Sequence, residues 1–195
     1  MTDALPPRSR RSPAKHRAIL AAAAEAVASD GYTATTIEGI AARAGVGKQT
    51  IYRWWPSKPA LFVEVYNHLV PQDALQADTG DVFRDLKSLL SGLFAIYRRT
   101  PAARVLAGLI AEAQHDPAAA DAVRSGLVIG RRGLLTEPLR RGVDRGRLAA
   151  DFDVEWTSDA ITALIWHRLL SGRTPLTDAD AHDLVAKLLG TRETR

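Results

Sequence analysis

The feature that most constrains this fold is a tight link, Gly45-Val46-Gly47, between two short segments with helical periodicity. Apolar residues repeat at intervals of three and four before the link, and Gly45 stands where a helix would end. The next segment, Lys48 to Trp55, must end near Pro56, because proline disfavours helical geometry in the residue before it. Two short helices about a glycine-containing turn are typical of a helix-turn-helix domain.

Longer helices are expected on both sides of this pair. Ser12 can cap the first helix and Pro13 suits its first position, and the apolar pattern that follows ends at Gly31. Thr35 and the glutamate three positions later have the spacing of a capping box, which predicts where the first short helix begins. After the second short helix, Ser57 caps a fourth helix that runs to about residue 70.

The rest of the chain has only helical patterns. Residues 1–11 lack periodicity and are expected to form a flexible basic arm. Pro71, Gly80 and several polar residues predict a linker, so we assign residues 12–75 to the helix-turn-helix domain and 76–195 to a second domain. Further helices are expected near residues 82–97, 105–110, 117–145, 153–171 and 178–189. Because no alternating strand pattern of useful length occurs, the predicted fold class is all-α.

Positive charge is concentrated at the N-terminal end. Residues 1–58 hold nine Lys or Arg against four Asp or Glu, whereas residues 59–195 hold 17 against 18. The whole net charge of +4 therefore comes from the first part of the chain. Such asymmetry predicts a segment that binds a polyanion, followed by a neutral body with another task.

The second short helix carries side chains suited to double-stranded DNA. Lys48, Gln49 and Arg53 can reach base edges, since Lys and Arg favour the acceptors of guanine and Gln pairs with adenine. Donors to phosphate oxygens are expected from Thr50, Tyr52, Trp54 and Lys58. Ile51 and Trp55 lie four residues apart and are expected to pack inward. Trp54, rotated by about 100° from Trp55 on a helix, is then expected to face the nucleic acid.

The stretch AILAAAAEAVASDGYTATTIEGIAARAGVGKQTIYRWWPSKPALF resembles the DNA-binding domain of TetR-type transcriptional regulators along its whole length. It has the family's Gly-Tyr after the first helix, the TT…IA..AGV pattern, and T.Y followed by SK..L at the expected spacing. The resemblance implies phosphate contacts from Thr36, Thr50, Tyr52 and Lys58, with Thr35 beside them, and sequence reading by Lys48, Gln49 and Arg53. Two residues depart from the pattern: Gly47 stands where the family often has Ser, and Trp54 where a smaller polar residue is common.

The same resemblance implies that the second domain pairs with its twin and holds a small-molecule cavity. Residues expected at the dimer interface are Ile161, Leu164, Ile165 and Leu169, beside the expected long helix at 117–145. Residues expected to line the ligand pocket are Phe94, Tyr97, His115, Trp166 and His167. The implied protein is a homodimeric transcription factor, a repressor that a small-molecule effector releases from a pseudo-palindromic operator.

Several other classes of protein are disfavoured by the sequence. No apolar stretch approaches the roughly 18 residues of a membrane span, and no signal peptide is recognisable, so we expect no membrane association and a cytoplasmic location. The chain has no cysteine, and its five histidines lack metal-binding spacing, so no metal and no cofactor is expected. No phosphate-binding glycine loop, HExxH or Gly-x-Ser-x-Gly motif occurs, which argues against an enzyme.

Three alternatives stay open at this point. The regulator could be an activator, or it could act without a small-molecule ligand. From a different class, the chain could be a helical enzyme with an incidental basic N-terminus.

Overall fold

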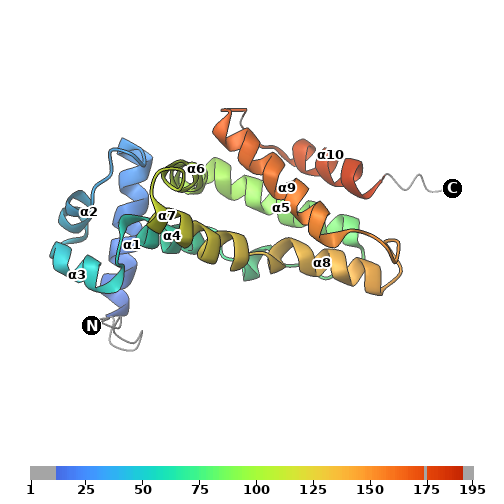
Figure 1. The fold of residues 1–195 in the computed structure, drawn as a ribbon, viewed down its shortest axis with the longest axis horizontal. Coiled ribbons are helices and arrows are strands. Elements are labelled where there is room, and N and C mark those ends of the chain that lie inside the picture. Colours follow the sequence, from blue (N-terminus) through green and yellow to red (C-terminus); the bar gives the residue numbers. More distant parts are fainter. Residues whose placement is uncertain (1–11, 174, 191–195) are drawn as a thin grey trace. The chain divides into compact units, whose positions relative to one another are not determined.

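The computed structural model describes residues 12–173 and 175–190, which form helices and loops with no strand among them (Figure 1). The predicted all-α fold is confirmed. The predicted arm at residues 1–11 lies outside the described part. Contacts divide the chain into two compact units, Met1–Leu69 with Thr100–Leu127 and Val70–Arg99 with Val128–Arg195. Each unit is therefore discontinuous in sequence, and the expected boundary between functional domains after residue 75 stays a prediction.

The first unit is built from six α-helices of the described chain: α1 (Pro13–Asp30), α2 (Ile37–Ala44), α3 (Lys48–Trp54), α4 (Lys58–Leu69), α6 (Ala102–Glu112) and α7 (Pro117–Val123). Pro13 occupies the first turn of α1 as predicted, and Gly31 ends the helix with a φ of 82°. Gly45 ends α2 in the left-handed conformation, with a φ of 63°, which only glycine adopts readily. Ile40 and Ile51 are completely buried, so the two short helices share one core.

Helix α6 approaches the end of α1 closely, although some 75 residues separate them in the chain. The Arg104 guanidinium donates a hydrogen bond of 2.9 Å to the carbonyl oxygen of Ala28. One turn later Gly108 faces Tyr32, and a Cβ atom added at Gly108 would lie 2.2 Å from Cγ of the Tyr32 ring. Only a residue without a side chain allows this approach, so α6 belongs to the helix-turn-helix unit by contact.

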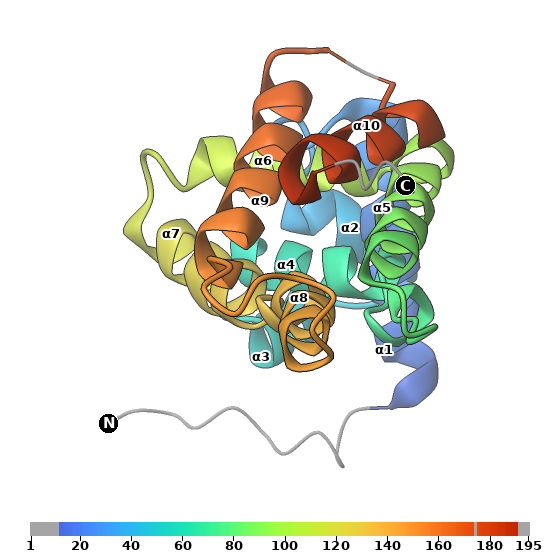
Figure 2. The ribbon, with the colours of Figure 1, turned by 90° about the vertical axis from the view of Figure 1, so that its right-hand side faces the viewer.

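The second unit contains a short 3₁₀ turn, Asp73–Leu75, and four α-helices: α5 (Val82–Arg99), α8 (Gly133–Asp144), α9 (Val154–Leu170) and α10 (Asp178–Leu189). In Figure 2, α10 lies beside α5 and α9 beside α8, and both pairs are in contact. Helix α5 supplies a fully buried apolar row that includes Leu86, Leu90 and Phe94. This spacing of four residues is the inward face of an amphipathic helix.

The expected long helix at residues 117–145 is broken in the structure. Helix α7 ends at Val123, a π-helical turn follows at Arg124–Ile129, and α8 starts only at Gly133. Glycines at positions 126, 130 and 133 weaken helix propensity through this region. Gly126 also lies so close to Val63 of α4 that a Cβ atom there would be 2.4 Å from Val63 Cγ1. The prediction of one continuous helix was therefore wrong.

Candidate nucleic-acid interface

The exposed side of α3 presents four polar side chains on one helical face, which we call the reading face: Lys48, Gln49, Tyr52 and Arg53. Positions i, i+1, i+4 and i+5 of an α-helix lie close together around its axis. Tyr52 is 48% exposed, so its phenol is accessible from solvent. Opposite this face, Ile51 is fully buried and anchors the helix. The predicted base-reading residues therefore lie together and face solvent.

Charges around the reading face leave it positive. Lys48 forms an ion pair of 3.6 Å with Glu38 of α2, and both side chains are more than half exposed. An exposed pair of this length contributes little to stability, so the ammonium remains available to a stronger anion. Arg53 is exposed in the last turn of α3, and Thr50 is half-buried beside it in the first turn.

Thr36, rather than Thr35, caps α2. The Thr36 hydroxyl oxygen accepts a hydrogen bond of 3.1 Å from the backbone N–H of Gly39, and Thr36 has the extended backbone of an N-cap residue. Thr35 is only 4% exposed, and its hydroxyl donates to the carbonyl oxygen of Gly31 at 2.7 Å. The predicted capping box at Thr35 and the expected place of Thr35 at the DNA are both contradicted. Thr36 is exposed at the start of α2, where a phosphate would meet free backbone N–H groups.

Trp54 is buried, contrary to expectation. Trp54 and Trp55 are each 3% exposed, and their rings meet edge to face with centroids 5.7 Å apart. The expected rotation of 100° applies only while the helix continues, but the backbone at Trp55 is extended, with φ −134° and ψ 118°. Both indoles therefore turn into the unit, and the His16 ring of α1 stacks on Trp55 at 5.3 Å. The expected contact of Trp54 with phosphate is not supported.

Lys58 is held by the turn after α1. Its ammonium donates a hydrogen bond of 2.9 Å to the carbonyl oxygen of Tyr32 and lies 4.3 Å from the centre of the Tyr32 ring. Burial lowers the pKa of Lys58, while the charge of Glu112 acts in the opposite direction. The phosphate contact expected of Lys58 stays a prediction. In the structure the same ammonium also joins the start of α4 to the turn after α1.

The Tyr32 hydroxyl donates a short hydrogen bond to the carboxylate of Glu112 at the end of α6. Burial, followed by this hydrogen bond, raises the pKa of Tyr32 well above its ordinary value, so the phenol stays protonated. These two residues are 80 positions apart. No local pattern in the sequence could have revealed the contact.

Comparison with known proteins agrees with this geometry. Residues 76–188 match the family model for the tetracyclin repressor-like C-terminal domain, and residues 19–65 match that for bacterial regulatory proteins of the tetR family. The chain belongs to the TetR family. A similar protein is the uncharacterized HTH-type transcriptional regulator YdeS of Bacillus subtilis, which is 31% identical over 90% of this chain and 88% of its own length.

Other TetR-family proteins are similarly close. The DNA-binding transcriptional repressor TetR of Mycobacteroides abscessus is 31% identical over 92% of this chain and 94% of its own. The crystal structure of the TetR family transcription regulator SCO0332 is 37% identical, with a TM-score of 0.75 over 90% of this chain and 96% of that one. Thermus thermophilus FadR, solved in complex with lauroyl-CoA, shares the fold at 22% identity, with a TM-score of 0.68 over 92% of this chain and 96% of that one. The protein is thus a DNA-binding transcriptional regulator of the TetR family.

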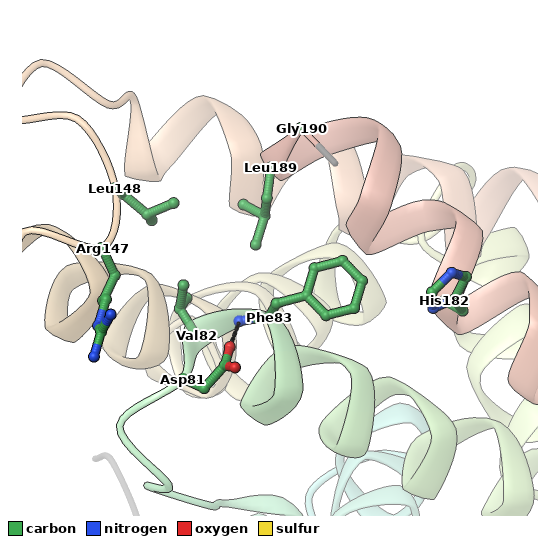
Figure 3. Close-up of a pocket in the computed structure, with 8 residues that line it drawn as sticks. All are labelled: Asp81, Val82, Phe83, Arg147, Leu148, His182, Leu189 and Gly190. Atoms are coloured by element: carbon green, nitrogen blue, oxygen red, sulfur yellow. Dashed lines mark hydrogen bonds between the residues drawn. The ribbon is translucent and has the colours of Figure 1, made fainter. Parts of the chain in front are cut away.

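In this TetR-family chain the second unit has a half-open cavity of about 440 Å³, between the start of α5, the loop after α8 and the end of α10 (Figure 3). Its lining residues are Asp81, Val82, Phe83, Arg147, Leu148, His182, Leu189 and Gly190. The Phe83 and His182 rings meet edge to face at 5.5 Å across it. The volume lies within the range of small-molecule sites, about 300–1,000 Å³.

The expected pocket residues lie elsewhere. None of the five lines this cavity. Phe94 is buried in the core, Tyr97 and Trp166 are half-buried, and His167 is exposed. His115 is exposed beyond the end of α6, in the other unit. Their ligand contacts stay predictions, and the cavity residues were missed because they come from three separated segments.

The dimer residues expected on α9 fall on two different sides of that helix. Ile161 and Ile165 are 1% and 4% exposed, because they pack into their own unit, so the expectation that they meet a partner subunit is contradicted. Leu164 is 38% exposed, and Leu169 is half-buried. The largest exposed apolar side chain of α9 is instead Trp156, at 63%.

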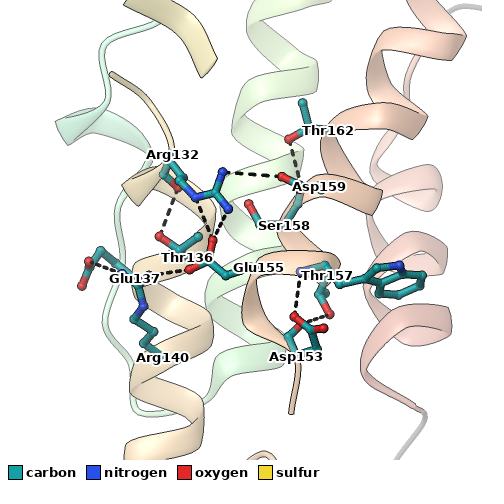
Figure 4. Close-up of polar contacts among 11 residues, drawn as sticks. Arg132, Thr136, Glu137, Arg140, Asp153, Glu155, Thr157, Ser158, Asp159 and Thr162 are labelled. Carbon is teal, nitrogen blue, oxygen red and sulfur yellow. Dashed lines mark hydrogen bonds and ion pairs between the residues drawn. The ribbon is translucent and has the colours of Figure 1, made fainter. Parts of the chain in front are cut away.

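An ion-pair network links α9 to α8 and to the residue just before α8 (Figure 4). The Glu155 carboxylate accepts hydrogen bonds from Arg132, at 2.7 Å from Nε, and from Arg140, at 2.5 Å. The hydrogen bond from Arg132 is the main cause that lowers the pKa of Glu155. Thr136 and Thr157 are buried, and each hydroxyl donates to a carbonyl oxygen one turn earlier in the chain. The ion pairs of Glu155 therefore link the start of α9 to α8 and to the residue just before it.

Within residues 12–173 and 175–190, no three His, Cys, Asp or Glu side chains are grouped so that they could hold a metal ion. No helix of the described chain has the length and apolar character needed to cross a membrane.

Proposed function

We propose that this regulator is a homodimeric repressor that binds a pseudo-palindromic operator through α3 and leaves it when a small molecule binds the second unit. The observation that carries the proposal is the reading face, with Lys48, Gln49, Tyr52 and Arg53 exposed together on a helix whose opposite side is anchored in the core. Lys, Arg and Gln are the side chains that read base edges in the major groove. Because the proposed target is genomic DNA, we expect the protein to act in the cytoplasm.

The DNA-binding part is tested by selecting bound sequences from random DNA with the full chain and measuring affinity by mobility shift. The variant Lys48→Ala/Gln49→Ala/Arg53→Ala should lose selective binding while its circular dichroism spectrum is unchanged. A matched control, Arg84→Ala/Lys87→Ala, removes two exposed cations of α5 and should bind the selected DNA like the parent. If the triple variant keeps its selective binding, these three side chains of α3 do not read the bases and the assignment is refuted.

A second copy of the chain is the partner we assign to α9. Trp156, Ala160, Ala163, His167 and Leu170 follow one another at intervals of four, three, four and three residues, which we call the α9 stripe. This spacing is that of a helix packed along another helix. Trp156 and Leu170 are both more than half exposed in the single chain, and burying them against a second copy would remove apolar surface from water.

The dimer has a geometric reason as well. Two helix-turn-helix units must meet successive major grooves about one helical turn of DNA apart, which a two-fold dimer provides. Light scattering of Trp156→Glu should show the mass of a monomer and loss of operator affinity, whereas Trp166→Phe should remain dimeric. A Trp156→Glu protein that keeps the dimer mass would contradict this interface.

Release by an effector rests on the second unit. Thermus thermophilus FadR, a repressor with the same fold, is known in complex with lauroyl-CoA, and the cavity in Figure 3 has the volume of a small-molecule site. By linkage, an effector that weakens DNA binding must itself be bound more weakly by the DNA complex. We therefore expect one compound of a metabolite panel that includes lauroyl-CoA to dissociate the operator complex.

Three results decide this part of the proposal. If the effector occupies the cavity, Leu148→Trp should fill it and abolish release without changing operator affinity, while Ala179→Trp, on the exposed side of α10, should release normally. An operator complex that no compound dissociates would favour a regulator without an effector. A reporter gene that is expressed less when the protein is deleted would identify an activator.

A further inference from the structure

The direction in which α3 points depends on contacts outside the helix. It has only seven residues, so it contains few internal hydrogen bonds, and helices this short are not stable by themselves. Its last residue is Trp54, and the backbone becomes extended at Trp55. Whatever holds this end therefore sets the angle at which the reading face meets DNA.

One carboxylate, that of Glu64 on α4, meets groups from two other helices at this end. Its Oε2 accepts a hydrogen bond of 2.6 Å from the indole Nε1 of Trp55. Its Oε1 lies 2.8 Å from Nε2 of His16 on α1. The His16 ring in turn stacks on Trp55. Glu64 is thus the point where α1, the end of α3 and α4 are joined by polar contacts.

The burial of the cluster gives these contacts their effect. Trp55 is almost fully buried, and the side chains of His16 and Glu64 are 23% and 32% exposed. In such surroundings a hydrogen bond is stronger than in water, and a buried indole N–H without an acceptor is costly. Apolar packing alone would hold Trp55 in place but would leave its rotation less defined, because hydrogen bonds are directional and dispersion is not.

We propose that Glu64 is a positioning residue for DNA recognition: through Trp55 and His16 it sets the orientation of α3 and thereby the discrimination between operator and other DNA. The inference rests on the proposed operator binding. Base contacts require exact placement of side chains, whereas attraction to phosphates depends on charge and tolerates small rotations. Loss of the Glu64 contacts should therefore weaken operator binding more than binding to unrelated DNA.

The test compares affinities of full-length variants for the selected operator and for a scrambled duplex of the same length. Glu64→Ala should reduce the ratio of the two affinities by about tenfold or more, the size expected when a hydrogen bond to a charged group is lost. Glu64→Gln should restore most of the ratio, since its amide oxygen can still accept the hydrogen bond from the Trp55 indole. Glu25→Ala is the matched control, because it removes the same charge from an exposed position of α1 and should leave the ratio unchanged.

A double-mutant cycle keeps the inference open to refutation if one variant folds poorly. In Glu64→Ala/Trp55→Phe the ratio should fall by less than the two single losses combined, because both changes remove the same hydrogen bond. Equal losses on operator and scrambled DNA, a Glu64→Gln protein as impaired as Glu64→Ala, or additive effects in the cycle would each overturn the proposal. Failure of the parent protein to select any sequence would instead overturn the proposed function itself.

Discussion

Gly108 on α6 is the position where one added methyl group should disturb the DNA-binding unit most. A Cβ atom there would lie 2.2, 2.5 and 2.6 Å from Cγ, Cδ1 and Cβ of Tyr32. These atoms are at the base of the side chain, so no rotation of the ring tip relieves the clash. Either α6 or the turn that carries Tyr32 must move.

Two opposing effects set the magnitude of Gly108→Ala. Replacing glycine by alanine inside a helix is worth about 1 kcal/mol of added stability when space is free. Overpacking a close contact costs about 1–3 kcal/mol, and the short distances to Tyr32 favour the upper end. We expect the variant to lose about 2 kcal/mol of unfolding free energy. Gly133→Ala at the start of α8 is the control, because its nearest neighbour would be Glu137 Cγ at an ordinary 3.7 Å.

The assay is urea unfolding followed by circular dichroism, with all proteins at the same concentration because a dimer's stability depends on it. Gly108→Ala should unfold at lower urea with an unchanged slope, which identifies a change in stability rather than in the denatured state. Gly133→Ala should unfold at the same or higher urea. A Gly108→Ala protein at least as stable as the parent would refute the reasoning, since it would mean that α6 is free to move away from Tyr32.

Three further predictions concern polar contacts. Tyr32→Phe removes the hydroxyl that donates to Glu112, and it should lower the unfolding free energy by about 1–3 kcal/mol in the same urea assay. Lys58→Ala should weaken binding to every DNA sequence by a similar factor and reduce the slope of log affinity against log salt concentration by about one. Mobility shift at several salt concentrations measures both effects. A loss of affinity for the operator alone would contradict the phosphate role. The hydrogen bond from Arg145 is the main cause that lowers the pKa of Asp78 to about 2. A carboxylate whose pKa is lower in the folded state than in the unfolded state stabilises the fold at pH values above its unfolded-state pKa. The contribution of Asp78 should therefore fade as pH drops from about 5 towards 2. Thermal unfolding of Asp78→Asn, measured over this pH range, should lack this part of the pH dependence.

Much of the DNA-binding unit could be predicted from the sequence because its signals are local. Pro13, Gly31 and Gly45 act within one turn of the helix ends they define. The reading face follows from the helical spacing of Lys48 to Arg53 once Ile51 is assigned to the core. Even the error at the cap of α2 was a shift of one residue, from Thr35 to Thr36.

Other features depended on groups far apart in the chain. Trp54 was expected to be exposed because Trp54 and Trp55 were treated as neighbours on one helix, rotated by about 100°. In the structure the helix ends at Trp54 and the backbone is extended at Trp55, so both side chains are buried. Helix α9 has apolar residues around most of its circumference, so its pattern alone did not tell whether Ile161 or Leu164 faces the core. Packing of α9 within its unit, against α8 among others, made that choice.

The sequence by itself determined that the chain is helical, where the helix proposed to read DNA lies and which side of that helix is polar. Only the tertiary structure decided that Trp54 and Trp55 are both buried, that Tyr32 contacts Lys58 and Glu112, and that α6 packs in the same unit as α3. The physical reason is the range of the forces involved. Helix caps and periodicity act over three or four residues, whereas burial and polar pairing are settled by whichever distant segment fills the remaining space.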